Sequence, residues 1–289
     1  LFTVGALSSA NMPACVRFLE VETVHELGHQ WFQSVVATNE AEEPWLDEGF
    51  TDYSATRAMR YLYRGGVFDC MGWSLSYLGM RRLEYLAMPE VPMYGKAWDF
   101  GSITNYAVAT YSKPAVALST LERVVGEEAM LRFLQTYFNR YAFAHPTTAD
   151  VRAVMAETLG YGTSDWFFDE LVYEDGIMDA YVGTLEKYEA QVERRGDLCL
   201  PNKVRVTYRG GGGRQVVWLC ETLEEDTLSF AGDEPITKVQ IDPGGEILVD
   251  ADRANNGLSR HPDWRAWLGV VVRVIHTAQN FFFLGGAAW

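Results

Sequence analysis

The chain has 289 residues, of which 48% are hydrophobic, which is enough for a soluble globular protein with more than one domain. Its 24 lysines and arginines face 39 aspartates and glutamates, so the formal net charge is -15. This balance argues against nucleic acid or another polyanion as a partner.

The first residues contain no basic segment followed by an apolar run, as a signal peptide would, and the chain starts at Leu1 rather than Met. We therefore expect a fragment of a longer protein.

The four cysteines are widely spaced and include no CxxC pair, so neither a cysteine zinc site nor a disulfide scaffold is indicated. A Cys199–Cys220 disulfide is an alternative, but two semi-buried thiols are favoured.

Residues 15 to 173 are predicted to be a succession of helices, because strand signals are few and glycine or proline breaks recur. The first helix carries His25-Glu26-Leu27-Gly28-His29, an HExxH motif. Four residues separate the two histidines, so both imidazoles lie on one helical face and can bind one metal ion. Glu26 lies about 100° further round the helix, which suits a general base better than a ligand.

The next predicted helix supplies the third ligand. The segment Trp45-Leu46-Asp47-Glu48-Gly49-Phe50 places Glu48 after 18 intervening residues. Pro44 is suited to the first turn of this helix, and the preceding loop lets the two helices run antiparallel. Glu48 can then face the histidines, which completes a three-ligand zinc site with a fourth position open to water.

The motifs HELGHQW and WLDEGF resemble those of the gluzincin peptidases, specifically the aminopeptidase N and leukotriene hydrolase family. The resemblance implies one catalytic Zn²⁺ per chain, ligands His25, His29 and Glu48, the base Glu26, a peptide substrate and a thermolysin-like helical domain. The family's GxMEN-type stretch, which binds the substrate's α-amine, does not occur in this sequence, and the family's N-terminal β domain is missing. Exopeptidase specificity is therefore inferred from relatives only.

Tyr111-Ser112-Lys113 resembles the family's YxKG segment, whose tyrosine stabilises the oxyanion. The resemblance implies this role for Tyr111, although Pro114 replaces the usual glycine. Tyr106 and a purely structural tyrosine remain alternatives. Asp47 and Asp52 are candidates for carboxylates that orient the metal-binding imidazoles; for Asp52, which lies one turn beyond Glu48, a solvated surface charge is an equal alternative.

Thr147 and Asp150 precede apolar residues at helical spacing, which predicts a capped helix from residue 147 to 159. After residue 175 the pattern changes to alternation. Residues 204–208 and 216–220 flank a glycine run and predict a hairpin, and the apolar runs 236–241 and 247–249 follow. Residues 176–252 are therefore predicted to form a small antiparallel β-sandwich.

The segment from Trp264 to Trp289 is apolar on one helical face, but its polar residues interrupt it before it reaches spanning length. Docking on the fold or on a partner is favoured over contact with a membrane surface through residues 264–289. The sequence leaves the compartment open between a membrane-associated and a cytoplasmic location.

These patterns predict an α+β protein. Residues 1–175 form an α-rich, thermolysin-like (gluzincin) catalytic domain, residues 176–252 a β-sandwich, and residues 253–289 a tail with an amphipathic helix.

In the predicted mechanism, zinc lowers the pKa of a water to about 7. Glu26 takes the proton of this water as the water attacks the scissile carbonyl, and zinc and Tyr111 stabilise the oxyanion. The predicted function is a zinc aminopeptidase. The alternative is a non-catalytic module of a larger membrane-associated protein, although such a module has no need for Glu26.

Overall fold

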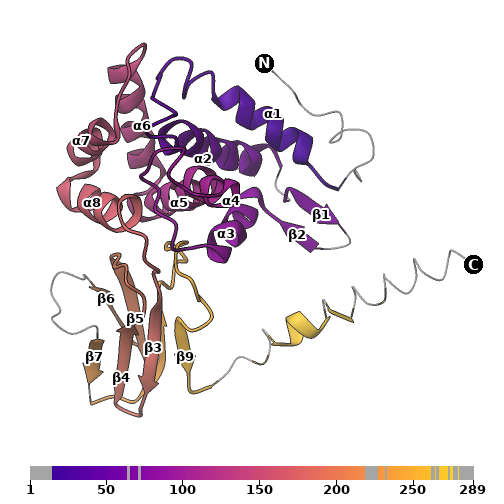
Figure 1. The fold of residues 1–289 in the computed structure, drawn as a ribbon. Helices are drawn as coiled ribbons and strands as arrows, with labels where there is room; N and C mark the ends of the chain where they lie inside the picture. The colour runs from indigo at the N-terminus through magenta and orange to yellow at the C-terminus, as the bar shows by residue number, and fades with distance from the viewer. Residues whose placement is uncertain are drawn as a thin grey trace, which may run out of the picture.

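The computed structural model describes residues 15–63, 66–70, 73–218, 227–231 and 233–261, with separate positions from 264 to 279. In this part of the chain, helices come first and two larger sheets follow, as Figure 1 shows from indigo to orange. Ahead of the larger sheets, the last helical element ends at Val172, and the first strand of those sheets begins at Ala180. The chain is thus an α+β protein, as its sequence predicts; the domain bounds stay a prediction.

The helical elements surround α2, which packs against α1, α3, α5 and η1. Their bounds are α1 (Phe18–Gly28), α2 (Trp45–Leu62), α3 (Tyr77–Ala87), α4 (Ile103–Ala107), the π-helix η1 (Val108–Ser112), α5 (Lys113–Val125), α6 (Glu127–Tyr141), α7 (Thr148–Leu159), α8 (Tyr161–Asp165) and the π-helix η2 (Trp166–Val172).

Two features of α2 explain its position. Pro44 is its N-cap residue, and Asp47 and Glu48 lie in its first turn, where negative charge is favoured by the helix dipole. Phe50 is fully buried and stacks on Trp45 and on Tyr137 of α6, with ring centroids 5.8 Å and 5.4 Å away. This aromatic contact holds the first turns of α2 against the core, and with them Glu48.

Glycines set the spacing of the helices around α2. A Cβ at Gly28 would lie 2.9 Å from Cγ2 of Thr51, and a Cβ at Gly49 would lie 2.5 Å from Cβ of Pro114. Both approaches are too close for a larger residue. Gly28 therefore lets α1 approach α2, and Gly49 lets α2 approach α5.

The capped helix predicted from Thr147 is confirmed as α7. The backbone N–H of Thr147 donates to Oδ2 of Asp150 at 2.8 Å, which completes a capping box. The helical region also contains a small hairpin that the sequence did not predict, made of β1 (Phe68–Cys70) and β2 (Trp73–Leu75).

The expectation that no disulfide supports the fold is wrong. Cys15 and Cys70 form a disulfide with Cα atoms 5.2 Å apart, because a bridge between Val16 and Phe68 brings the start of the described chain to β1. Sequence spacing cannot show such a contact, since 55 positions separate the two cysteines. Cys199 is also disulfide-bonded; Cys220, its candidate partner, lies outside the described residues.

The later strands form two antiparallel sheets. One has the order β3 (Ala180–Leu185), β4 (Glu189–Arg194), β7 (Thr227–Ala231), and the other the order β6 (Gly213–Trp218), β5 (Asn202–Tyr208), β8 (Ile236–Ile241), β9 (Gly257–Ser259). The predicted hairpin is confirmed, since β5 pairs with β6 and Val204 lies opposite Val216. The predicted run 236–241 is β8.

Residues 247–249 form a buried turn rather than the strand that their apolar side chains predict. Helical residues take up their backbone groups: Arg82 Nε donates to the Leu248 carbonyl at 2.8 Å, Tyr85 OH donates to the Val249 carbonyl at 3.2 Å, and the Leu248 N–H donates to Thr120 Oγ1 at 3.2 Å. The turn therefore joins the second sheet to α3 and α5.

The described positions from 264 to 275 are helical. Trp264, Trp267, Val270 and Val274 are each more than half exposed, so most of the surface of these side chains remains open to solvent. Other positions of this predicted amphipathic helix lie outside the described residues. Among the described helices, none has both the length and the apolar character needed to cross a membrane.

Candidate metal centre

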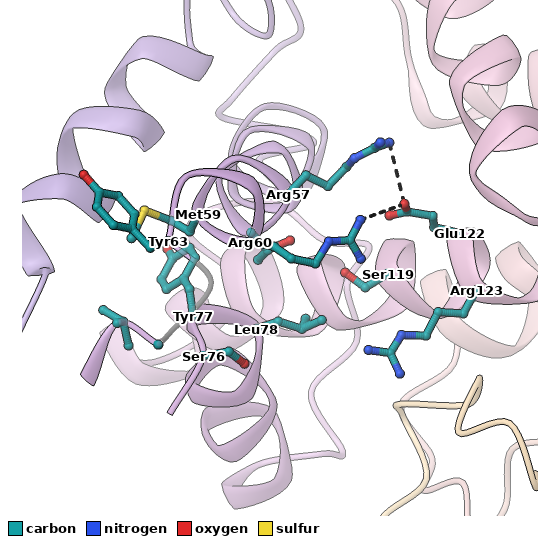
Figure 2. A pocket seen from close by; sticks show the side chains of 13 residues that line it. Arg57, Met59, Arg60, Tyr63, Ser76, Tyr77, Leu78, Ser119, Glu122 and Arg123 are labelled. Carbon is teal, nitrogen blue, oxygen red and sulfur yellow. Dashed lines mark hydrogen bonds and ion pairs between the residues drawn. The ribbon is translucent and has the colours of Figure 1, made fainter. Parts of the chain in front are cut away.

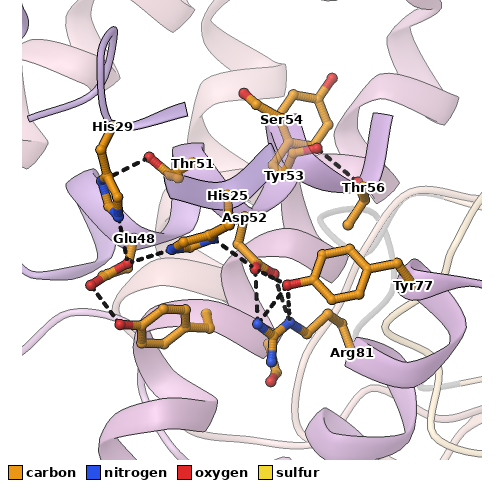
Figure 3. A network of polar contacts seen from close by, with 12 residues as sticks. His25, His29, Glu48, Thr51, Asp52, Tyr53, Ser54, Thr56, Tyr77 and Arg81 are labelled. Carbon is orange, nitrogen blue, oxygen red and sulfur yellow. Dashed lines mark hydrogen bonds and ion pairs between the residues drawn. The ribbon is translucent and has the colours of Figure 1, made fainter. Parts of the chain in front are cut away.

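The structure brings His25, His29 and Glu48 together between α1 and α2 (Figure 3). One potential ligand atom from each residue lies within 4.8 Å of the other two. Oε2 of Glu48 lies 3.1 Å from Nε2 of His25 and 3.4 Å from Nε2 of His29. The sequence predicted these three residues as ligands of one metal ion.

These separations fit a zinc ion. Zinc–nitrogen and zinc–oxygen bonds are about 2.0 Å long and tetrahedral in protein sites, so two ligand atoms on one ion lie about 3.3 Å apart. The two distances to Glu48 are close to that value. Two imidazoles and one carboxylate are also a donor set that catalytic zinc sites use. The residues present therefore fit zinc.

The other nitrogen of each imidazole faces an aspartate from α2. Nδ1 of His29 lies 2.7 Å from Oδ1 of Asp47, and Nδ1 of His25 lies 3.3 Å from Oδ1 of Asp52. The second contact is at ion-pair distance but off the direction of a hydrogen bond. The structure thus places both predicted aspartates beside the histidines, one with each ring.

The electrostatic field of this cluster favours positive charge. Burial opposes protonation of His25, but Asp52 and Glu48 outweigh it and raise its pKa to about 9. In the same way, Asp47 and Glu48 outweigh burial and raise the pKa of His29 to about 10. Burial would raise the pKa of Glu48, but the two histidines and Tyr111 lower it to about 2. A divalent cation would replace the protons on the two imidazoles and meet the same carboxylates.

Glu26 faces the space beside the metal ligands. It is half-buried and lines a cavity of about 270 Å³ together with His29, Gln33, Glu40 and Glu48. Within the part of the chain that the structure describes, its carboxylate has no hydrogen-bond or ion-pair partner. A carboxylate that has no such partner and opens into this cavity is available to a water molecule or a substrate.

Tyr111 lies on the other side of Glu48, on the π-helix η1. Its hydroxyl donates to Oε1 of Glu48 at 2.5 Å, and its ring stacks on His25 with centroids 5.6 Å apart. The ring of Tyr106 lies behind it, 6.4 Å from that of Tyr111. Burial and the charge of Glu48 raise the pKa of Tyr111, so its phenol stays protonated and can donate. A π-helical turn is a frequent feature of functional sites.

A second cavity, of about 160 Å³, lies between α2, α3 and α5 (Figure 2). Its lining contains one carboxylate, Glu122, which Arg57 and Arg60 approach to 3.8 Å and 3.3 Å. Neither a histidine nor a cysteine lines it. This cavity therefore has no donor set for a metal ion, and the candidate site is the cluster around His25.

Sequence reasoning missed the partners of Asp52. This fully buried carboxylate accepts hydrogen bonds from Tyr77 and from Arg81 of α3. It also missed Thr51, whose Oγ1 lies 3.4 Å from Nδ1 of His29. The separations of 25 and 29 positions from Asp52 to its partners follow no local spacing, so no sequence signal pointed to them.

Comparison with known proteins gives a consistent result. The model of the peptidase family M1 domain matches residues 16–172. Aminopeptidase N of Streptomyces lividans is 30% identical over 147 residues, which cover 50% of this chain and 17% of that protein. The probable aminopeptidase 2 of Sulfurisphaera tokodaii is 25% identical over 232 residues, 78% of this chain and 29% of that protein. The chain thus spans less than a third of the length of these curated relatives.

Among solved structures, Legionella pneumophila aminopeptidase A in complex with aspartic acid is similar in fold. Its TM-score is 0.55 at 16% sequence identity, and the match covers 80% of this chain and 26% of that one. At this identity the similarity concerns the fold alone.

Proposed function

Because the chain belongs to peptidase family M1, we propose that it is a zinc-dependent peptidase of the aminopeptidase type. The observation that carries this proposal is the grouping of His25, His29 and Glu48 around one point, beside a cavity that the carboxylate of Glu26 lines. Aminopeptidase names among the relatives support the exopeptidase assignment. The substrate is a peptide.

In this proposal Nε2 of His25, Nε2 of His29 and the Glu48 carboxylate hold one zinc ion per chain. A bound zinc ion supplies a Lewis acid that polarises the scissile carbonyl and lowers the pKa of water to about 7. Glu26, which has no partner in the described part of the chain, accepts the proton of the attacking water and passes it to the leaving amine. The protonated phenol of Tyr111 donates to the oxyanion that forms.

Asp47 and Asp52 have a supporting role in the same proposal. Each lies beside Nδ1 of one histidine. A carboxylate that accepts the Nδ1–H fixes the tautomer and orientation of a metal-binding imidazole, as Asp47 does for His29, and Asp52 attracts Nδ1 of His25 from ion-pair distance. The nitrogen that remains, Nε2, is the one that faces Glu48. The two aspartates thus orient both rings toward one ion.

The sheets would form the β-sandwich that the sequence predicts. Val182 and Val192 of the first sheet and Val206 and Val239 of the second are fully buried in one core, and β3 contacts both β8 and β9. We found no cluster of metal-binding side chains in this part of the described chain. Its proposed role is to support α3 and α5 through the turn at residues 247–249.

Contact of residues 264–289 with a membrane surface is a further proposal, motivated by the exposed apolar side chains of Trp264, Trp267 and Val270. Flotation with zwitterionic liposomes, comparing the chain with a version that ends at residue 263, tests it. If both chains float equally, the segment does not bind the membrane, and packing on a partner protein becomes its proposed role.

For location, the Cys15–Cys70 disulfide supports an oxidising compartment over the cytoplasm.

The proposed activity is tested with fluorogenic peptides that carry either a free or a blocked amino terminus. We expect zinc-dependent cleavage that a chelator abolishes and added zinc restores, with a preference for the free amine. Cleavage of blocked peptides alone would replace the aminopeptidase assignment with an endopeptidase. A zinc-loaded chain that cleaves neither would favour the non-catalytic binding module.

A further inference from the structure

Arg81 of α3 contacts both the support of His25 and the element that carries Tyr111, although it touches neither a metal ligand nor the cavity beside Glu26. Its guanidinium binds both oxygens of Asp52, with Nε 2.8 Å from Oδ2 and Nη2 2.9 Å from Oδ1 (Figure 3). Nη2 also donates to the hydroxyl of Tyr77 at 2.7 Å, and that hydroxyl donates to Asp52. Three hydrogen bonds from two residues thus converge on one carboxylate.

Asp52 needs these partners because it is fully buried. A carboxylate without water loses its solvation, and only a paired cation with good hydrogen-bond geometry compensates for that loss. Arg81 supplies the cation, and its two parallel bonds fix the plane of the carboxylate. The position of Oδ1, 3.3 Å from Nδ1 of His25, therefore depends on Arg81.

The remaining nitrogen of the same guanidinium is linked to η1 through Glu84 of α3. Nη1 of Arg81 donates to Oε2 of Glu84 at 2.8 Å, and the same oxygen accepts the hydroxyl of Ser112 at 2.6 Å. Ser112 follows Tyr111 directly and ends η1. The guanidinium carbon also lies 5.6 Å from the ring centre of Tyr111, within the range of a cation–π contact.

We propose that Arg81 is a positioning residue that holds His25, through Asp52, and Tyr111, through Glu84 and Ser112, in one fixed arrangement. This inference rests on the proposed function, since it assigns a purpose to the geometry of that site. One rigid planar group with five donors bonds to two carboxylates on different helices. A displacement of α3 would therefore move the metal-binding imidazole and the oxyanion-binding phenol together.

The alternative is a purely structural ion pair between α2 and α3. Arg152 provides the matched control, because it also binds both oxygens of one carboxylate, with Nη1 2.6 Å and Nη2 3.1 Å from the Asp169 oxygens, and lies on α7 rather than beside the metal ligands. Zinc affinity separates the two roles. A structural pair would change the melting temperature of the Arg81 variants without changing the affinity of folded protein for zinc.

The first measurement is the zinc dissociation constant of the full chain, by competition with a chelating dye below the melting temperature of every variant. We expect Arg81→Met to weaken zinc binding by about 10- to 100-fold, as loss of a partner that orients a metal ligand does, and Arg152→Met to leave it within a factor of two. Arg81→Lys keeps the charge but loses the planar fork, so it should also weaken binding, by less. If Arg81→Met does not fold, the zinc affinity of Arg81→Lys tests the positioning role instead. Zinc affinity within a factor of two of the parent in folded Arg81 variants would overturn the proposal.

The second measurement isolates the contact with η1. Ser112→Ala removes one hydroxyl that bonds to Glu84 and leaves Asp52 and its partners intact. We expect kcat to fall by about 3- to 10-fold, the effect of one hydrogen bond, with KM and zinc affinity unchanged. An unchanged kcat would remove Tyr111 from the proposal. Zinc binding does not require turnover: a chain whose Arg81 variants lose zinc but whose parent cleaves no peptide would refute the proposed function and leave this inference standing.

Discussion

The phenol of Tyr111 donates to Oε1 of Glu48 at 2.5 Å, while Oε2 of the same carboxylate faces the two histidines. One oxygen of Glu48 thus faces the candidate metal position, and the other accepts the hydrogen bond of the candidate oxyanion donor. Because the two residues are 63 positions apart, this relationship depends on the packing of η1 against α2.

Tyr111→Phe should reduce kcat by about 10²–10³-fold, the loss seen when one oxyanion donor is removed. The phenol is not one of the three ligands, so zinc should still bind, but loss of its hydrogen bond to Glu48 should weaken that binding by about 10- to 100-fold. Turnover is therefore compared at saturating zinc. Tyr106→Phe is the matched control: its ring lies 6.4 Å from that of Tyr111 and should affect kcat little. A larger loss in Tyr106→Phe than in Tyr111→Phe would exchange the two assignments.

Glu26→Gln should keep zinc while turnover falls by at least about 10²–10⁴-fold, the usual contribution of a general base. The amide has the shape of the carboxylate but cannot accept the proton. Metal analysis and peptide kinetics on the same sample measure both effects. Near-normal turnover with normal zinc content would rule out Glu26 as the base.

Glu48→Ala should remove most of the zinc, because two imidazoles alone make a poor tetrahedral site. Asp47→Ala, which removes the partner of His29 at 2.7 Å, should weaken zinc binding by about 10- to 100-fold and leave a measurable site. Mass spectrometry of the metal-loaded protein measures the occupancy. If Glu48→Ala keeps full zinc occupancy, Glu48 is not a ligand.

Lys113 should make stability depend on alkaline pH. Its side chain is fully buried and donates to the carbonyls of Val91 and Glu174, and burial lowers its pKa to about 8. Between pH 8 and about 10.4, the usual lysine value, the unfolded chain holds a proton that the folded chain has lost. The free energy of unfolding therefore rises with pH across this window, by about 3 kcal/mol in total.

The measurement is denaturant unfolding of the parent chain and of Lys113→Met from pH 7 to 10.5. The variant lacks two donors and should be less stable at every pH, but the difference between the two curves should widen as pH increases through 8. Parallel curves would mean that Lys113 titrates normally in the folded protein.

Cys70→Ser should lower the free energy of unfolding by about 4 kcal/mol, because the Cys15–Cys70 bond closes a loop of 55 positions and restricts the unfolded chain. Cys15→Ser should have the same effect, and the double variant should lose no more than either single one. Additive losses in the double variant would show that the two cysteines act separately.

The sequence by itself determined the local geometry of the site. Helical periodicity places His25 and His29 on one face with Glu26 beside it, whatever surrounds them. Pro44 and the acidic first turn define where α2, the helix that carries Glu48, begins. The α7 cap, the β5–β6 hairpin and the α+β class also follow from local signals. Each depends on backbone preferences within a few residues.

Tertiary structure alone decided which distant groups meet. It paired Asp47 with His29 and Asp52 with His25, placed Tyr111 rather than Tyr106 against Glu48, joined Cys15 to Cys70, and turned residues 247–249 into a buried contact with Arg82 and Tyr85. The contacts of Arg81 with Asp52 and Glu84 were also decided by tertiary structure alone. These contacts join segments up to 166 positions apart, and their partners are selected by the packing of whole helices, a quantity that no short stretch of sequence contains.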